Sequence, residues 1–208
     1  MDYNLFSTPV VVNKDFISSD DREEMVEKLR VKPAHQYQAL HGDAVSSFDF
    51  PVNIVGHLGL TNLINEKLKE YSEKVHIPEL YILNSWFNVQ HPGSSLRLHN
   101  HCGSIVSGAL YLKVDDKSSP LVFKDPRDLG VFVYQSDPYA EYAPQPGDLV
   151  LFPSWLMHGS HEHINQSDER IVISFNTGLT NDRANFLRYL EKDYGILIDL
   201  NKSGVTSE

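Results

Sequence analysis

Two histidines that share one face of a short extended segment have the clearest capacity for chemistry in this sequence. His99 and His101 flank a single asparagine, and in an extended strand side chains two residues apart point to the same face. Their backbone positions lie about 6–7 Å apart at the rise of a strand, so both imidazoles can approach one ion. A third ligand would complete one face of an octahedral metal site and leave its other positions open.

His158 is the best candidate for that third ligand. It follows the turn Pro146-Gly147-Asp148 and the apolar run Leu149–Phe152, which has the length and composition of a buried strand. We therefore expect His158 to emerge beside the core of a sheet. The alternative ligands, His161 and His163, lie in a polar stretch typical of an exposed loop, where histidines need no special role.

Arg170 opens a predicted strand whose two faces differ in polarity. It shares one face with Ser174 and Asn176. The opposite face is wholly apolar: Ile171, Ile173 and Phe175. The polar face should meet a wet cavity or solvent, and a guanidinium is well suited to hold a carboxylate by two parallel hydrogen bonds. Arg170 is thus a candidate for gripping the far carboxylate of an acid bound at the metal. The alternative is an exposed edge residue paired with a neighbouring acid.

The same alternation of strand faces places further residues around this cavity. Ser107 and Tyr111 share a face of the predicted strand Ile105–Val114, and Asn88 lies with Trp86 on the strand before it. For Tyr111 and Trp86 the alternative is a place in the core with the polar atom satisfied. Small residues follow Ser107 and leave room for a ligand beside the histidines.

From residue 80 to 177 the sequence consists of short strands separated by turn signals. Residues 81–89 alternate in polarity, and turns such as Pro92-Gly93 recur at a spacing of about ten residues. This pattern predicts a mainly β protein with supporting helices, in a sandwich or barrel of the jelly-roll type. We expect one domain over 1–208, with distinct parts along the chain: helical and loop support (1–78), the jelly-roll core (79–177), and a C-terminal helix and tail (178–208).

The remaining segments provide support. Helical signals occur in three places: from Ser18–Asp21 onward, over 53–75 with a break near Gly59, and from Asn181 to Lys192. Leu5–Val12 contains a proline, which favours an edge strand or a lead-in segment. Residues 31–54 are expected to form loops, and the sequence assigns them no role.

Composition restricts the classes of partner. Eighteen basic and 28 acidic residues give a formal charge of −10, which opposes non-specific binding to nucleic acid or to anionic membranes. The one cysteine, Cys102, allows no intramolecular disulfide and favours a reducing compartment; we expect it to be a small packing residue. No stretch approaches the roughly 20 apolar residues that span a bilayer, and the first residues lack the pattern of a secretory signal. These features predict a cytoplasmic protein.

Several motifs occur in a fixed order between about residues 80 and 177: Trp86-Phe87-Asn88, Pro92-Gly93, His99-Asn100-His101, Ser107–Leu112, Asp125-Pro126-Arg127, Pro146–Trp155, His158, Glu169-Arg170-Ile171 and Ser174-Phe175-Asn176. As an ordered set they resemble the iron(II)/2-oxoglutarate-dependent oxygenases, in the branch common in marine bacteria and in phages of cyanobacteria. The set is far more specific than any one of its members.

The resemblance implies a double-stranded β-helix (cupin-like) fold, iron(II), and 2-oxoglutarate as cosubstrate. It also implies a hydroxylation related to that of prolyl 4-hydroxylases, in which O2 is consumed and 2-oxoglutarate is decarboxylated to succinate. His99, His101 and His158 fall on the metal positions, and Arg170 falls where the superfamily binds the C5 carboxylate. The other residues expected at the cofactor site are Tyr111, Ser107, Asn176 and Asn88. The substrate would be a small molecule or a peptidyl group, a homodimer is in keeping with such enzymes, and a phage-encoded copy would act in the host-cell cytoplasm.

One residue departs from the superfamily pattern, which has His-x-Asp or His-x-Glu where this chain has His101. A neutral imidazole in place of a carboxylate makes the iron site more positive by one unit, so iron(II) and dianionic 2-oxoglutarate sum to zero rather than to −1. Three-histidine faces also occur in thiol dioxygenases and metal-binding cupins. Two alternatives therefore stay open: a three-histidine metal enzyme that uses no oxo-acid, and a non-catalytic jelly-roll binding module with structural histidines.

Overall fold

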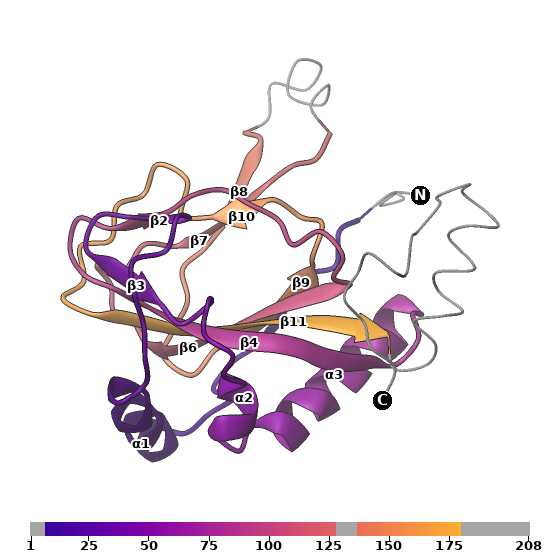
Figure 1. Cartoon of the computed structure of the whole chain (residues 1–208). Coiled ribbons are helices and arrows are strands. Elements are labelled where there is room, and N and C mark those ends of the chain that lie inside the picture. Colours follow the sequence, from indigo (N-terminus) through magenta and orange to yellow (C-terminus); the bar gives the residue numbers. More distant parts are fainter. Residues whose placement is uncertain (1–6, 128–136, 180–208) are drawn as a thin grey trace, which may run out of the picture.

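The computed structural model describes residues 7–127 and 137–179, in which antiparallel sheets lie opposite each other (Figure 1). The larger sheet has the strand order β1-β9-β6-β11-β4-β3. Its strands are, in chain order, β1 (Val11–Asn13), β3 (Ala44–Ser46), β4 (Leu80–Gln90), β6 (Val106–Lys113), β9 (Leu149–Pro153) and β11 (Arg170–Leu179). The prediction of a mainly β protein with supporting helices is confirmed.

The opposite layer is made of shorter strands. A three-stranded sheet has the order β10-β7-β8, and β2 pairs with β5 on the same side of the molecule (Figure 1). These strands are β2 (Leu40–His41), β5 (Ser95–Leu96), β7 (Leu121–Lys124), β8 (Tyr139–Tyr142) and β10 (His158–Gly159). The two layers enclose the interior in which the candidate site lies.

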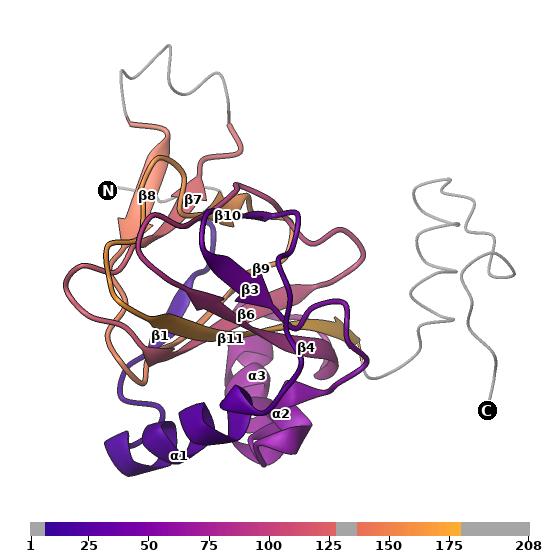
Figure 2. The same ribbon diagram turned by 60° about the vertical axis from the view of Figure 1, so that its left-hand side comes forward.

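Helices cover the outer face of the larger sheet, as the rotated view shows (Figure 2). They are α1 (Ser19–Arg30), α2 (Ile54–His57) and α3 (Thr61–Val75). As predicted, α1 begins after Ser18, whose hydroxyl accepts a hydrogen bond from the Asp21 amide at 3.2 Å. The predicted break is also present, because Gly59 separates α2 from α3 with a φ of +73°, a conformation that glycine adopts without strain.

The alternating strands of the larger sheet divide the apolar residues into two clusters. Ile171, Ile173 and Phe175 of β11 pack with Ile64 and Leu68 of α3 beneath the sheet. The second cluster lies on the other face, between the layers, and includes Ala109, Tyr111, Val150, Phe152 and Val172. The sheet is therefore buried on both faces, and the polar residues of its inner face must find partners inside the molecule.

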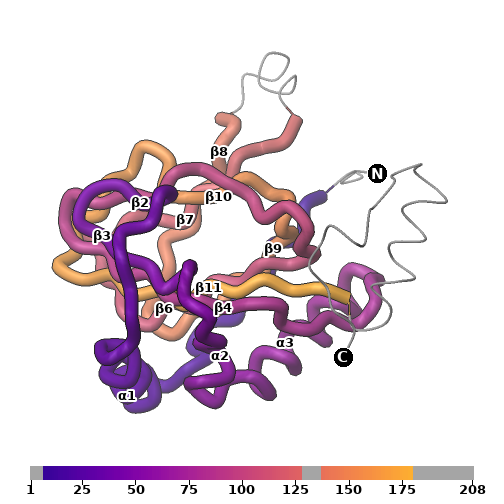
Figure 3. The backbone as a smooth tube through the Cα atoms, in the orientation of Figure 1, coloured from indigo at the N-terminus to yellow at the C-terminus, as the bar shows by residue number. Residues whose placement is uncertain are grey.

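Residues 31–54 differ from the prediction of loops, because they contain β2 and β3. Figure 3 shows this segment rising from α1 to β2 and returning through β3 to α2. Strand β1 lies at an edge of the larger sheet, but it begins at Val11, beyond the proline of the predicted Leu5–Val12 segment. The predicted helix Asn181–Lys192 lies outside the described residues. Within them, no helix combines the length and apolar character needed to cross a bilayer.

Candidate metal and cofactor site

Backbone pairing between two distant segments brings the three predicted histidines together. The His99 amide donates to the His158 carbonyl at 2.9 Å, and the His158 amide donates to the His99 carbonyl at 2.8 Å. The His101 amide donates to the Ser154 carbonyl at 2.9 Å. One ligand nitrogen from each of the three rings lies within 4.8 Å of the other two, and no other group of potential ligands in the described residues meets this criterion.

Hydrogen bonds orient two of the three imidazoles for metal binding. The Nδ1 atom of His99 lies 2.8 Å from the Arg97 carbonyl, and Nδ1 of His158 lies 2.8 Å from the Leu156 carbonyl. A carbonyl only accepts, so each Nδ1 carries the proton, and Nε2 of the neutral ring offers its lone pair. This carbonyl contact is a common outer-shell feature of metal-binding histidines.

Burial keeps these rings neutral. It lowers the pKa of His101 to about 4, and it is also the largest cause that lowers the pKa of His99 and of His158. A metal binds the unprotonated imidazole, so the histidines are in the required state at neutral pH. Three neutral nitrogen donors, with no fourth ligand from the part of the chain that the structure describes, suit a divalent transition metal with open positions. The donor set therefore fits iron(II).

Arg170 lies inside the molecule and has no acidic partner among the described residues. Its side chain is 6% exposed, and its Nη1 donates to Oε1 of Gln90 at 2.5 Å. Its Cζ lies 5.3 Å from the ring centroid of Tyr111, a contact of the cation–π type. Its Nε is buried and makes no hydrogen bond with described residues. Burial lowers the pKa of Arg170, but an arginine keeps its charge in proteins. A buried, unpaired cation calls for an anionic ligand.

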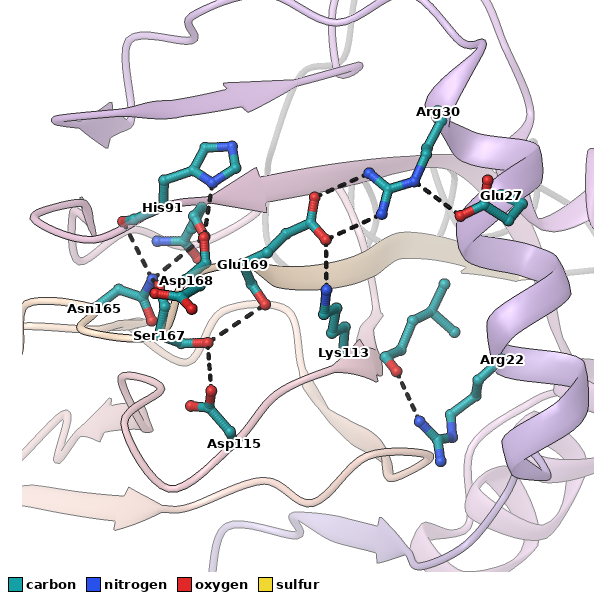
Figure 4. Close-up of polar contacts among 12 residues, drawn as sticks. Arg22, Glu27, Arg30, His91, Lys113, Asp115, Asn165, Ser167, Asp168 and Glu169 are labelled. Atoms are coloured by element: carbon teal, nitrogen blue, oxygen red, sulfur yellow. Dashed lines mark hydrogen bonds and ion pairs between the residues drawn. The ribbon is translucent and has the colours of Figure 1, made fainter.

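A network of ion pairs on the outside of the sheet holds the first residues of β11 (Figure 4). Glu169 accepts hydrogen bonds from Nη1 of Arg30 in α1 at 3.1 Å and from Nζ of Lys113 in β6 at 2.8 Å. Burial alone would raise the pKa of Glu169, but these hydrogen bonds outweigh it and lower the pKa. Glu169 is therefore occupied by these two partners, and the predicted alternative, an exposed Arg170 paired with a neighbouring acid, does not occur.

One cavity of about 450 Å³ between the layers joins the histidines to Arg170. Every residue that the sequence placed at the site lines it: His99, His101, His158, Arg170, Tyr111, Ser107, Asn176 and Asn88. The volume lies in the range of small-molecule sites. The enclosure is large enough for a dicarboxylic acid and part of a second molecule.

Two of these residues are engaged with each other. The Ser107 hydroxyl donates to Oδ1 of Asn176 at 2.8 Å and shares a 2.8 Å hydrogen bond with the Ser154 hydroxyl. This chain links β11, β6 and the segment after β9, whose Ser154 carbonyl receives the His101 amide. The contacts indicate that Ser107 and Asn176 position the strands of the site.

Several residues that line the cavity were not singled out in the sequence: Gln90, Arg97, Tyr37 and Phe48. Gln90 was detectable in principle, since it continues the face of β4 that carries Asn88. Tyr37 and Phe48 come from the 31–54 segment, in which no local period points to the cavity. They reach it through pairings with distant strands, which a single sequence does not display.

Two expectations about small residues are corrected. The space beside Gly108 is filled by Phe175, since a Cβ atom at Gly108 would lie 2.1 Å from that ring. The room expected from the missing side chain of Gly108 is thus taken by Phe175, although Gly108 and Ala109 both line the cavity. Cys102 is exposed at the cavity mouth and is not a packing residue; its thiol lies 3.5 Å from Oδ1 of Asn100.

The competing histidine pair lies away from the cavity. His161 stacks on Tyr139 with ring centroids 3.9 Å apart, and Nε2 of His163 lies 2.8 Å from the carboxylate of Glu141. Neither belongs to the group that could share a metal ion. Both have ordinary surface roles, as predicted.

Comparison with known proteins agrees with the resemblance found in the motifs. Residues 84–176 match the model of a family described as "Putative 2OG-Fe(II) oxygenase". This range contains the three histidines and Arg170. No curated protein matches the sequence.

Solved structures share the fold across most of the chain. HygX from Streptomyces hygroscopicus, solved with nickel and 2-oxoglutarate bound, has a TM-score of 0.63 and 16% identity and covers 84% of each chain. A prolyl-4-hydroxylase from Pseudomonas putida has a TM-score of 0.60 and 14% identity, covering 85% of this chain and 96% of its own. The epimerase SnoN from nogalamycin biosynthesis, described as non-heme and alpha ketoglutarate dependent, has a TM-score of 0.63 and 11% identity, with 83% and 78% covered. These likenesses confirm the jelly-roll fold.

Proposed function

We infer that this protein is an iron(II)- and 2-oxoglutarate-dependent oxygenase, because residues 84–176 match the family model described as "Putative 2OG-Fe(II) oxygenase" and the fold is shared with HygX. The reaction we propose is hydroxylation: a substrate R–H, O2 and 2-oxoglutarate give R–OH, succinate and CO2. The single observation that carries the cofactor assignment is the buried guanidinium of Arg170, which lies in the cavity of the three histidines and has no acidic partner among the described residues.

The residues divide this work between them. His99, His101 and His158 would hold iron(II), which with 2-oxoglutarate supplies the activation of dioxygen. Arg170 would bind the far carboxylate of the oxo-acid by charge-assisted hydrogen bonds. Tyr111, buried beneath the guanidinium, would limit the cavity at this end; burial raises its pKa to about 12, so its hydroxyl stays protonated. Asn88, Ser107 and Asn176 complete the polar lining, and the hydrogen bond between Ser107 and Asn176 helps to hold β6 and β11 in register.

Arg170 favours this function over the alternatives. A three-histidine metal enzyme without an oxo-acid needs no buried cation opposite its metal, and a binding module with structural histidines would not keep three neutral rings turned toward one point. The neutral His101 raises the charge of the metal site by one unit. A dianionic cosubstrate compensates this charge, because the ligand brings both negative charges itself.

We propose further that the chain is one domain that acts on a small molecule or a peptidyl group in the cytoplasm. The formal charge of −10 supports the absence of a nucleic-acid partner. The single cysteine supports a reducing compartment. A homodimer and an origin in the marine bacterial and phage branch remain part of the proposal on the strength of the motifs alone.

The test is equilibrium binding of 2-oxoglutarate to protein loaded with zinc(II), a redox-inert ion, in the wild type and in Arg170→Ala. We expect the dissociation constant to rise at least tenfold, about 1.4 kcal/mol, with the metal content unchanged. Arg127→Gln is the matched control, since it removes an exposed arginine outside the cavity. Arg170→Lys, which keeps the buried charge, serves if the alanine variant is unstable.

Turnover provides the second readout. Iron(II)-loaded wild type should form succinate from 2-oxoglutarate in air, and Arg170→Ala should need a correspondingly higher oxo-acid concentration. Oxygen uptake that is independent of 2-oxoglutarate would favour the three-histidine alternative. Failure to take up metal in stoichiometric amount would favour the binding module.

A further inference from the structure

The cavity differs in charge from the rest of the chain. The sequence holds 28 acidic residues, yet none of the described residues that line the cavity is aspartate or glutamate. The charged side chains in the lining are two arginines, Arg97 and Arg170. An acidic protein thus encloses a positive cavity, and such a cavity raises the local concentration of anions.

Arg97 is the one of these two that faces the outside. It is exposed at the mouth of the cavity, and none of the described residues accepts a hydrogen bond from its guanidinium. Its amide donates to the Ala39 carbonyl at 2.9 Å, and Nδ1 of His99 lies 2.8 Å from its own carbonyl. The backbone of Arg97 is thus fixed close to the metal site, while its side chain is free to bind.

Aromatic rings form a continuous row from the histidines toward the 31–54 segment. The centroid of His101 lies 5.6 Å from that of Trp86, Trp86 lies 4.9 Å from Phe48, and Phe48 lies 4.9 Å from Tyr37. All four line the cavity. A row of rings in edge and tilted contact offers a rigid surface for an apolar or cyclic carbon skeleton.

The charges show that one anion does not neutralise this cavity. Iron(II) and dianionic 2-oxoglutarate cancel, since +2 and −2 sum to zero, and the three histidines are neutral. Arg170 and Arg97 then leave +2. That excess remains with the oxo-acid in place, and of the two arginines Arg97 at the mouth is the exposed one that a second anion can reach.

We propose that the substrate hydroxylated here is a small organic anion, whose negative group binds Arg97 and whose carbon skeleton lies along Tyr37, Phe48 and Trp86. This inference rests on the proposed function, because the oxo-acid must first occupy Arg170. It assigns to Arg97 the selection of the substrate by charge, and to the 31–54 segment the selection by shape. Carboxylates and phosphate monoesters share the chemistry that a guanidinium recognises.

The test is a saturation-transfer NMR screen on protein loaded with zinc(II) and saturating 2-oxoglutarate. The oxo-acid occupies Arg170, and the redox-inert zinc prevents turnover. The library holds cyclic and aromatic carboxylates, phosphate monoesters of the same skeletons, and the neutral amide of each carboxylate. It is screened on the wild type, on Arg97→Gln and on Arg127→Gln. The two variants carry the same formal charge, since 17 basic and 28 acidic residues give −11 in both, so long-range attraction is matched.

We expect anions to bind the wild type and Arg127→Gln at least fivefold more tightly than their amides, and this preference to vanish in Arg97→Gln. The stronger of the two anion classes identifies the substrate chemistry. Equal binding of acids and amides to the wild type, or an undiminished preference in Arg97→Gln, would overturn the inference while the proposed function stands. Failure of zinc-loaded protein to bind 2-oxoglutarate would refute the proposed function, and the inference with it.

Discussion

Unpaired donors at the inner end of the cavity indicate that a ligand belongs there. The guanidinium of Arg170 donates to Oε1 of Gln90, while Arg170 Nε and Gln90 Nε2 are buried without a described partner. Gln90 is 1% exposed. Buried groups that lack a hydrogen bond cost about 1–3 kcal/mol each. A bound carboxylate can accept from both donors, so its binding would satisfy atoms that the described residues leave unpaired.

Gln90→Glu tests this account with a nearly isosteric change. The new carboxylate would lie where Oε1 now accepts from Arg170, and it would pair with the guanidinium inside the protein. The internal ion pair would then compete with the cosubstrate for the same donors. We expect the dissociation constant of 2-oxoglutarate to rise at least tenfold, about 1.4 kcal/mol, as measured by calorimetry on zinc-loaded protein.

Asn84→Asp is the matched control for this substitution. Asn84 lies on the same face of β4 and also lines the cavity, but six residues away, about 20 Å along the strand. The charge change is identical and the distance to Arg170 is much greater. Similar losses of 2-oxoglutarate affinity in both variants would show that overall cavity charge, rather than the pairing at Arg170, governs binding.

At the scale of elements, the sequence predicted best what depends on local period. The alternation of β11 and β6 placed Arg170, Ser107 and Tyr111 on the cavity side, and the apolar face of β11 packs beneath the sheet. The alternation in residues 81–89 likewise placed Asn88 correctly. Strand period is set by backbone geometry, so it is visible in one sequence without knowledge of the partners.

What the sequence did not predict depends on pairing between distant segments. β2 has two residues and β3 has three, too few for a period to appear, and both are defined by their partners β5 and β4. The aromatic residues of 31–54 therefore carried no signal of their place in the cavity. Arg97 was overlooked for the same reason, because only the pairing of its amide with Ala39 fixes it at the mouth.

The ion pairs that Glu169 forms just before β11 predict that the Glu169→Gln variant loses stability in a pH-dependent way. Glu169 directly precedes Arg170, and its carboxylate binds Arg30 of α1 and Lys113 of β6 (Figure 4). Its folded-state pKa is lowered from 4.5, so its stabilisation is fully present above that pH and is lost as the pH falls through the lower folded value. We expect Glu169→Gln to lose about 1 kcal/mol of unfolding free energy at pH 7 and progressively less as the pH falls below 4.5, measured by urea denaturation.

Glu162→Gln provides the reference for that experiment, since Glu162 is an exposed acid in the same connection between β10 and β11. Its unfolding free energy should stay close to that of the wild type at each pH. A deficit in Glu169→Gln that is equal at pH 7 and pH 3 would mean that packing, and not the ion pairs, is lost in the variant.

At the scale of the whole molecule, the metal would connect segments that lie far apart in the sequence. His158 belongs to β10 of the smaller sheet, while His99 and His101 lie in the segment that leads into β6 of the larger one. Two backbone hydrogen bonds join these segments at the histidines. A shared ion would therefore add a further link between these two distant segments at the site.

Metal binding should accordingly raise the melting temperature of the whole domain. A ligand at a hundred times its dissociation constant stabilises the native state by about 2.7 kcal/mol, which corresponds to roughly 5–10 °C for a chain of this size. We expect this rise when anaerobic iron(II) is added to metal-free protein, and its reversal by a chelator, in differential scanning calorimetry. His158→Ala should abolish the rise, whereas His161→Ala, which removes a histidine outside the group of potential ligands, should retain it. A rise of equal size in both variants would place the stabilising ion elsewhere and would contradict the three-histidine site.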